Sequence, residues 1–232
     1  MSIKSAVSLF LLLSLLAACN APTPNPTTTS ATLPSIPPTS LPLDISPPPT
    51  SPPTSIVCPP CPSPSLLNHI VLNHAFEVIQ SLKNQDMITL SSYINPVSGV
   101  RFSPYSYLEE TDRVFSANQI INIFADSKVY SWGEHAGSGE PIDLSFWDYY
   151  SRFIYDVDFA NAPQMSLNGR LGGGSTIDNS PEFYPGAMIV EYYFPGIDPQ
   201  YEGLDWRSLR LVFTEDNGTW YLIGIIHDAW TP

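Results

Sequence analysis

The chain has 232 residues, of which 43% are hydrophobic and 13% charged, and its formal net charge at pH 7 is −13. Twenty-two acidic residues stand against nine lysines and arginines. Because a protein with this excess of negative charge repels the phosphate groups of DNA and RNA, we expect no nucleic-acid partner.

The N-terminal residues have the features of a secretory signal. Residues 1–5 carry one positive charge, Lys4, and residues 6–18 form an uncharged apolar run. That run is shorter than the roughly 20 residues needed to cross a bilayer, and it fits the apolar region of a signal peptide. Leu16-Ala17-Ala18-Cys19 resembles the lipobox of bacterial lipoproteins. The resemblance implies cleavage before Cys19 and diacylglycerol on its thiol. The alternative is an ordinary secretory signal that leaves this cysteine free.

A proline-rich segment follows. Sixteen of the 25 prolines lie between residues 20 and 65. Such chain has too little apolar area to offset its ordering entropy, so residues 19–65 are predicted to be the lipidated cysteine and a disordered tether. Cys58 and Cys61 have the spacing of a redox pair, but no strand precedes them. Outside the cytoplasm, a local disulfide or two exposed thiols is the favoured interpretation.

Residues 66–232 have the length of one globular domain. Its first helix is predicted from apolar residues at helical spacing between Leu67 and Leu82, with Ser65 as the cap. Asp86 is placed to cap a second, short helix that ends at Tyr93. Two further helices are predicted after Ser116, with Gln119 completing a capping box, and from Ser145.

The second half of the domain is predicted to be mostly β. Asn217-Gly218 is a strong hairpin signal, and the strand after it is apolar on both faces, which is typical of a central strand. Helices first and strands last predict an α+β domain, with the N-terminal helices packed on a curved antiparallel sheet. The predicted strands span residues 100–102, 128–132, 165–171, 188–194, 206–214 and 220–230.

This order of elements resembles the SnoaL-like and nuclear-transport-factor-like group, a cystatin-like cone. The matching pieces are the opening helices, residues 66–94, and the closing strands, residues 206–230. The segments 132–133, 137–142, 155–159, 206–212 and 224–230 are, in addition, similar to those of a family of uncharacterised bacterial lipoproteins. The resemblance implies a fold and a cellular location but no activity, because cone folds host isomerases, dehydratases and binding modules alike.

The closing hairpin yields one candidate site. A two-residue turn would place Arg207 opposite Asp228, and a three-residue bulged turn would place it opposite His227. We expect this cluster to bind an anionic or polar ligand. The alternative is a structural ion pair that closes the sheet.

A second candidate is the glycine-rich loop with Glu134, His135, Glu140 and Asp143, because a histidine beside carboxylates suits acid–base work. A solvated loop is the alternative. The candidate catalytic residues are thus His135, Glu140 and His227. No His-Glu-x-x-His or zinc cysteine spacing occurs, and Gly172-Gly173-Gly174 lacks the lysine of a phosphate loop, so neither metal nor cofactor is expected.

Three functions remain open. The first is a binding or accessory module, lipid-anchored on the extracytoplasmic side of a cell membrane or outer membrane. Aromatic residues beside carboxylates suit a cell-wall saccharide or peptide as its ligand. The second is an isomerase, dehydratase or hydrolase that uses His135 or His227 as acid or base. The third is a structural spacer of the envelope.

Overall fold

A computed structural model describes residues 64–174 and 176–231. The predicted signal peptide, Cys19, Cys58, Cys61 and nearly all of the predicted tether lie outside the described residues. Within the described part of the chain, no helix combines the length and apolarity that crossing a membrane requires.

Two helices open the domain, as predicted. Helix α1 spans Pro64–Asn84 and α2 spans Met87–Tyr93. The Asp86 carboxylate accepts a hydrogen bond from the Thr89 backbone N–H at 3.0 Å, which confirms the predicted cap. The inward face of α1 is fully buried through Val71, Ala75, Val78, Ile79 and Leu82.

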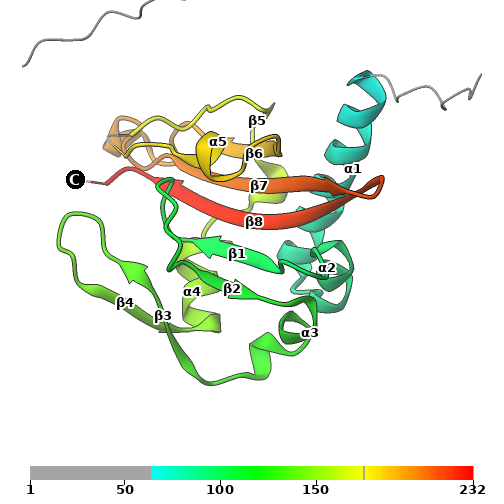
Figure 1. Ribbon diagram of the computed structural model, residues 1–232. Coiled ribbons are helices and arrows are strands. Elements are labelled where there is room, and N and C mark those ends of the chain that lie inside the picture. The colour runs from blue at the N-terminus through cyan, green and yellow to red at the C-terminus, as the bar shows by residue number, and fades with distance from the viewer. Residues whose placement is uncertain (1–63, 175, 232) are drawn as a thin grey trace, which may run out of the picture. The chain divides into compact units, whose positions relative to one another are not determined.

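The principal sheet has six strands in the order β2-β1-β8-β7-β6-β5. It is curved, and its strands are antiparallel except where β1 runs parallel to β8. Figure 1 shows the long β7 and β8 through its middle, so the prediction of a central final strand is confirmed. The strands are β1 (Val100–Ser103), β2 (Arg113–Phe115), β5 (Gln164–Leu167), β6 (Met188–Phe194), β7 (Arg207–Asp216) and β8 (Thr219–Ala229).

A separate hairpin is made by β3 (Val129–Glu134) and β4 (Pro141–Ser145). Mixed helices and a curved, mostly antiparallel sheet make the domain α+β, as expected. Short helices occupy the connections: α3 (Ala117–Ile120), η1 (Ile123–Ala125), α4 (Phe146–Phe153), η2 (Phe159–Asn161), α5 (Ser180–Phe183) and η3 (Pro199–Tyr201).

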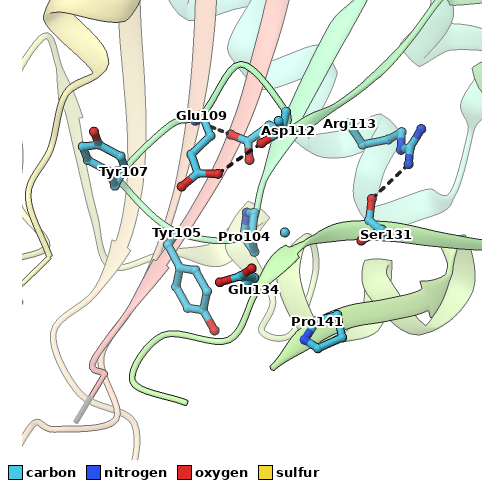
Figure 2. Close-up of a pocket in the computed structure, with 11 residues that line it drawn as sticks. Pro104, Tyr105, Tyr107, Glu109, Asp112, Arg113, Ser131, Glu134 and Pro141 are labelled. Carbon is cyan, nitrogen blue, oxygen red and sulfur yellow. Dashed lines mark hydrogen bonds between the residues drawn. The ribbon is translucent and has the colours of Figure 1, made fainter. Parts of the chain in front are cut away.

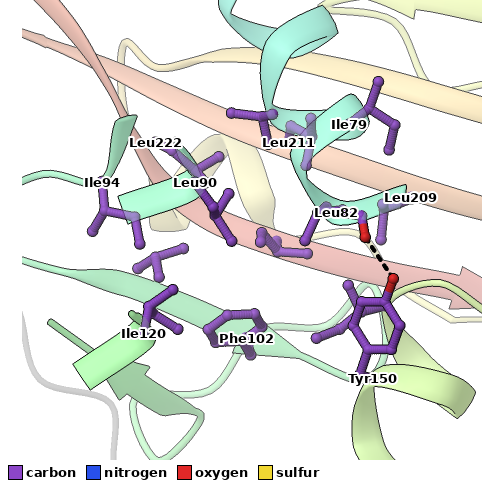
Figure 3. Close-up of a cluster of buried hydrophobic side chains, with 14 of the residues drawn as sticks. Ile79, Leu82, Leu90, Ile94, Phe102, Ile120, Tyr150, Leu209, Leu211 and Leu222 are labelled. Atoms are coloured by element: carbon purple, nitrogen blue, oxygen red, sulfur yellow. Dashed lines mark hydrogen bonds between the residues drawn. The ribbon is translucent and has the colours of Figure 1, made fainter. Parts of the chain in front are cut away.

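The main core lies between the helices and one face of the sheet (Figure 3). Leu209, Leu211 and Phe102 face α1, α2 and α4 there. The Tyr150 hydroxyl donates to the Leu82 carbonyl at 2.6 Å, which ties α4 to the end of α1. We refer to this sheet face as the helix face. The opposite face, which carries a small second cluster of Leu108, Ile189, Val212 and Ile226, is the outer face.

The β7–β8 register differs from both predicted pairings. The turn has two residues, with Asp216 opposite Thr219, but β8 contains an extra residue, Ile223, opposite the step from Val212 to Phe213. This β-bulge shifts every later pair by one, so Arg207 lies opposite Ala229 instead of Asp228 or His227. The periodicity of a strand gives no sign of such an insertion.

The predicted strand over 165–171 is too long. Strand β5 ends at Leu167, and the chain then crosses the outer face. The backbone N–H groups of Leu171 and Gly172 donate to the buried Glu191 carboxylate at 2.6 and 2.9 Å, and the Ser208 hydroxyl donates to it at 2.6 Å. These bonds replace the strand pairing that the sequence pattern predicts.

Candidate functional site

One pocket of the described residues is a cleft of about 510 Å³ beside the β3–β4 hairpin. One wall is the segment between β1 and β2, and the other is the hairpin (Figure 2). In Figure 2 the Tyr105, Glu109 and Glu134 side chains point into the space between these walls. The cleft is lined by Pro104, Tyr105, Tyr107, Glu109, Thr111, Asp112, Arg113, Ser131, Gly133, Glu134 and Pro141.

Asp112 is the most buried carboxylate of the cleft. Its carboxylate accepts hydrogen bonds from the Ser103 hydroxyl at 2.5 Å and from the Glu109 backbone N–H at 3.0 Å. Burial raises the pKa of Asp112 despite these two bonds, because desolvation disfavours the charged form. A carboxyl group with a raised pKa in a cleft is able to hold a proton that other aspartates release.

Arg113 connects β2 to the hairpin. Its Nη2 donates to the Ser131 carbonyl at 3.1 Å, and its guanidinium lies over the Tyr130 ring, 5.4 Å from the centroid. Of the described residues that line the cleft, this arginine is the single basic one, against three acidic ones. The cleft therefore has an excess of negative charge.

The two tyrosines of the cleft differ in packing. Tyr105 lies edge-on to Phe153, with ring centroids 6.0 Å apart, whereas Tyr107 is 50% exposed. Both place an aromatic surface next to carboxylates.

The glycine-rich loop contributes to the cleft through Glu134. The His135 backbone N–H donates to the Glu140 carbonyl at 2.7 Å, and the His135 ring packs near Phe153 at 6.4 Å. Neither His135 nor Glu140 lines the cleft, and the Glu140 and Asp143 side chains are exposed. The geometry thus places one of the four predicted loop residues at the cleft.

Arg207 and His227 meet through a third residue, Asp156, which follows α4. Arg207 Nε donates to Asp156 Oδ2 at 2.7 Å, and His227 Nε2 lies 3.3 Å from the same oxygen. His227 Nδ1 lies 3.3 Å from the Pro104 carbonyl, and Pro104 lines the cleft although His227 does not. The predicted proximity of Arg207 to His227 is present, with a shared carboxylate between them.

The Asp156 carboxyl group has a lowered pKa. Burial alone would raise this pKa, but the hydrogen bond and charge of His227 and the charge of Arg207 together outweigh it. A charge-assisted cluster of this kind joins the α4 region to the ends of β7 and β8.

Asp228 lies on the opposite face of the sheet. It forms an ion pair with Arg170 at 2.9 Å, while Arg207 and His227 face the helices. Burial raises the pKa of Asp228 although Arg170 opposes this. The predicted Arg207–His227–Asp228 cluster is therefore wrong as a single site, because the bulge at Ile223 and the alternation of side chains direct its members to two faces.

Sequence reasoning missed the partners of these groups. Asp156 lies 51 positions from Arg207, and Arg170 lies 58 positions from Asp228. No local pattern marks such pairs. Asp112 was not predicted as a site residue either. The polar run Glu109-Glu110-Thr111 before it indicates a connection between strands, where site residues are often found.

No metal centre is evident in the described part of the chain, where no three histidine, cysteine or carboxylate side chains are grouped for an ion. The acidic turn near Asp205 is closed by hydrogen bonds instead: its carboxylate accepts from the backbone N–H groups of Ile197 and Asp198.

Comparisons with known proteins do not assign the chain to a family. No family model matches it, and no curated protein matches it. A similar solved structure is described as a calcium/calmodulin dependent protein kinase II association domain from Xanthomonas campestris. The two share 12% sequence identity over 70% of this chain and 85% of the other, with a TM-score of 0.28. A likeness of this size carries no argument about function.

Proposed function

We propose that the chain is a lipid-anchored, extracytoplasmic binding module whose cleft takes an amine-bearing saccharide or peptide of the cell envelope. The observation that supports this most is the 510 Å³ cleft with three carboxylates, two tyrosines and one arginine. Its two walls come from different elements, so a ligand between them would contact both.

The polarity of the cleft favours a cationic group over a neutral one. Glu109 and Glu134 are exposed at the cleft, whereas the charge of Arg113 is directed to the Ser131 carbonyl. A ligand ammonium would gain charge-assisted hydrogen bonds from the glutamates and cation–π contact with a tyrosine ring. Sugar hydroxyls would find acceptors in the same carboxylates.

Calorimetric titration of the full chain tests this function. The probes are glucosamine and trilysine amide. Their uncharged partners are N-acetylglucosamine and trilysine amide acetylated at the N-terminus and on every side chain. We expect the amines to bind more tightly than the acetylated forms, and Glu109→Gln with Glu134→Gln to weaken amine binding by about tenfold. Glu140→Gln, an exposed change in the same loop but outside the cleft, is the matched control. Equal binding of amine and acetylated probes would refute the proposal.

The anchoring part of the proposal is supported by Leu16-Ala17-Ala18-Cys19. Two or more acyl chains hold a protein stably on a membrane, whereas one does so marginally. The full chain is expected in the membrane fraction, with mass spectrometry showing an acylated N-terminal Cys19. Cys19→Ser should move it to the soluble fraction, while Cys58→Ser should not. A full chain recovered soluble and unmodified would contradict anchoring.

We also propose that the sheet curves around α1 as in a cystatin-like cone.

Acid–base catalysis is a second candidate because of Asp112. A buried carboxyl with a raised pKa that lines a cleft is suited to donate a proton to a bound ligand. Incubating the full chain with each ligand that binds, and following the products by mass spectrometry, tests this function. Turnover that Asp112→Asn abolishes without loss of binding would favour the enzyme, and unchanged ligands would favour the binding module.

A further inference from the structure

A second pocket of about 290 Å³ lies on the outer face of the sheet and shares no lining residue with the cleft. It is enclosed by β6, β7 and the chain between β5 and β6. We propose that this pocket binds the carboxylate of a small organic acid, through Arg210. Its lining residues are Asn168, Gly169, Arg170, Asp178, Ser180, Pro181, Tyr184, Gly186, Ala187, Ile189 and Arg210.

Arg210 is the reason to expect a ligand here. Its side chain is 4% exposed, and Nη2 alone is bonded, to the Ser180 hydroxyl at 2.6 Å and to Asp178 Oδ2 at 2.9 Å. Nε and Nη1 are buried without a hydrogen-bond partner among the residues that the structure describes. Buried guanidinium N–H groups left without acceptors are destabilising, so an acceptor in the pocket would be favourable.

Most acceptors around this arginine already have partners, and none of them bonds to its Nε or Nη1. The two oxygens of Asp178 accept from the Ser180 backbone N–H at 3.0 Å and from Arg210. Asp228 Oδ2 is paired with Arg170, while its Oδ1 is buried without a hydrogen-bond partner among the described residues. The Glu191 carboxylate accepts three hydrogen bonds, from the Leu171 and Gly172 backbone N–H groups and the Ser208 hydroxyl. The pocket thus offers the two unused N–H donors of Arg210.

A monocarboxylate with a short apolar chain fits these surroundings best. Its two oxygens accept from Arg210 Nε and Nη1, and its single charge is repelled less by Asp178 and Asp228 than the double charge of a phosphate dianion would be. The remaining wall is apolar, with Pro181, Ala187 and Ile189. A cationic or purely hydrophobic ligand would leave the arginine without an acceptor.

Nuclear magnetic resonance on the ¹⁵N-labelled full chain tests the proposal. The readout is the Arg210 Nε–H signal, assigned with the Arg210→Lys variant, during titration with sodium butyrate. Butyramide has the same shape without the charge, and butylamine has the opposite charge. We expect a saturable shift with butyrate at millimolar concentrations and binding by the two analogues at least tenfold weaker. An Arg210 signal that does not move with butyrate, or moves equally with butyramide, would overturn the proposal.

Two variants distinguish a loss of butyrate binding at the pocket from a loss of folding. Ala187→Leu fills the pocket while keeping Arg210, and we expect it to abolish the butyrate shift with the backbone amide spectrum otherwise preserved. Glu109→Gln changes the cleft, which shares no lining residue with this pocket, and should leave butyrate binding unchanged. Butyrate binding that survives Ala187→Leu would place the acid elsewhere and refute the assignment. Amine binding by the cleft is independent of every one of these results.

Discussion

At the scale of single residues, Asp156 joins the chain after α4 to β7 and β8. It is the common partner of Arg207 and His227, at 2.7 and 3.3 Å, and its side chain is 15% exposed. We predict that Asp156→Asn lowers the free energy of unfolding by about 2 kcal/mol, because the partly exposed Arg207 and the buried His227 lose a charged acceptor. Urea unfolding of the full chain measures this loss. The control is Asp158→Asn, an exposed partner of Lys83 two residues away, for which we expect a smaller loss; equal losses would argue against the cluster.

The same carboxylate should give stability a characteristic pH dependence. The pKa of Asp156 is lowered in the folded protein from its ordinary value of 3.8, so the unfolded chain binds its proton more readily. The difference in unfolding free energy between wild type and Asp156→Asn should be fully present above about pH 4 and should shrink as the pH falls through the lowered pKa. Urea titrations at a series of pH values measure this difference. A difference that stays constant down to the acid limit would contradict the assignment.

At the scale of elements, the β7–β8 turn requires left-handed backbone. Asn217 and Gly218 have φ values of 52° and 82°, which suits a two-residue hairpin turn. We predict that Gly218→Ala lowers the free energy of unfolding by about 1 kcal/mol, since a Cβ is disfavoured at positive φ. Gly173→Ala is the matched control: its φ is not in the left-handed region, and an added Cβ meets no described atom within 4 Å. Thermal unfolding of both variants compares them, and equal stability would contradict the turn geometry.

The elements also show how far the sequence alone could lead. Caps and turns are local signals, so Asp86, Ser145 and Asn217-Gly218 located helices and the hairpin correctly. The bulge at Ile223 is set by twist and packing against β7, and it reversed the faces expected for the strand end. The sites depend on contacts between distant segments, which explains why Glu134 was identified while Asp112 and Arg210 were not.

At the scale of the whole molecule, the net charge of −13 should raise the affinity for cationic ligands. An acidic protein attracts cations over a distance set by ionic strength, about 10 Å at 0.1 M salt. We predict that the affinity for glucosamine falls several-fold as sodium chloride rises from about 50 to about 500 mM, where screening is nearly complete. Butyrate binding should not weaken in parallel, because screening removes repulsion of an anion. Calorimetry at both salt concentrations measures this contrast; glucosamine affinity independent of salt would contradict it.

The extra residue in β8 has a consequence for shortening the chain. Because Ile223 has no partner across the ladder, removing it would leave Phe213 opposite Leu222 and Val212 opposite Gly224, as now. Removing Ile225 instead would either keep the bulge and turn Asp228 inward and His227 outward, or close the bulge and put Gly224 in the core position of Ile225. Deletion of Ile223 should therefore be tolerated, whereas deletion of Ile225 should strongly lower the stability of the fold. Secreted yields of the two deletion variants would reveal the asymmetry.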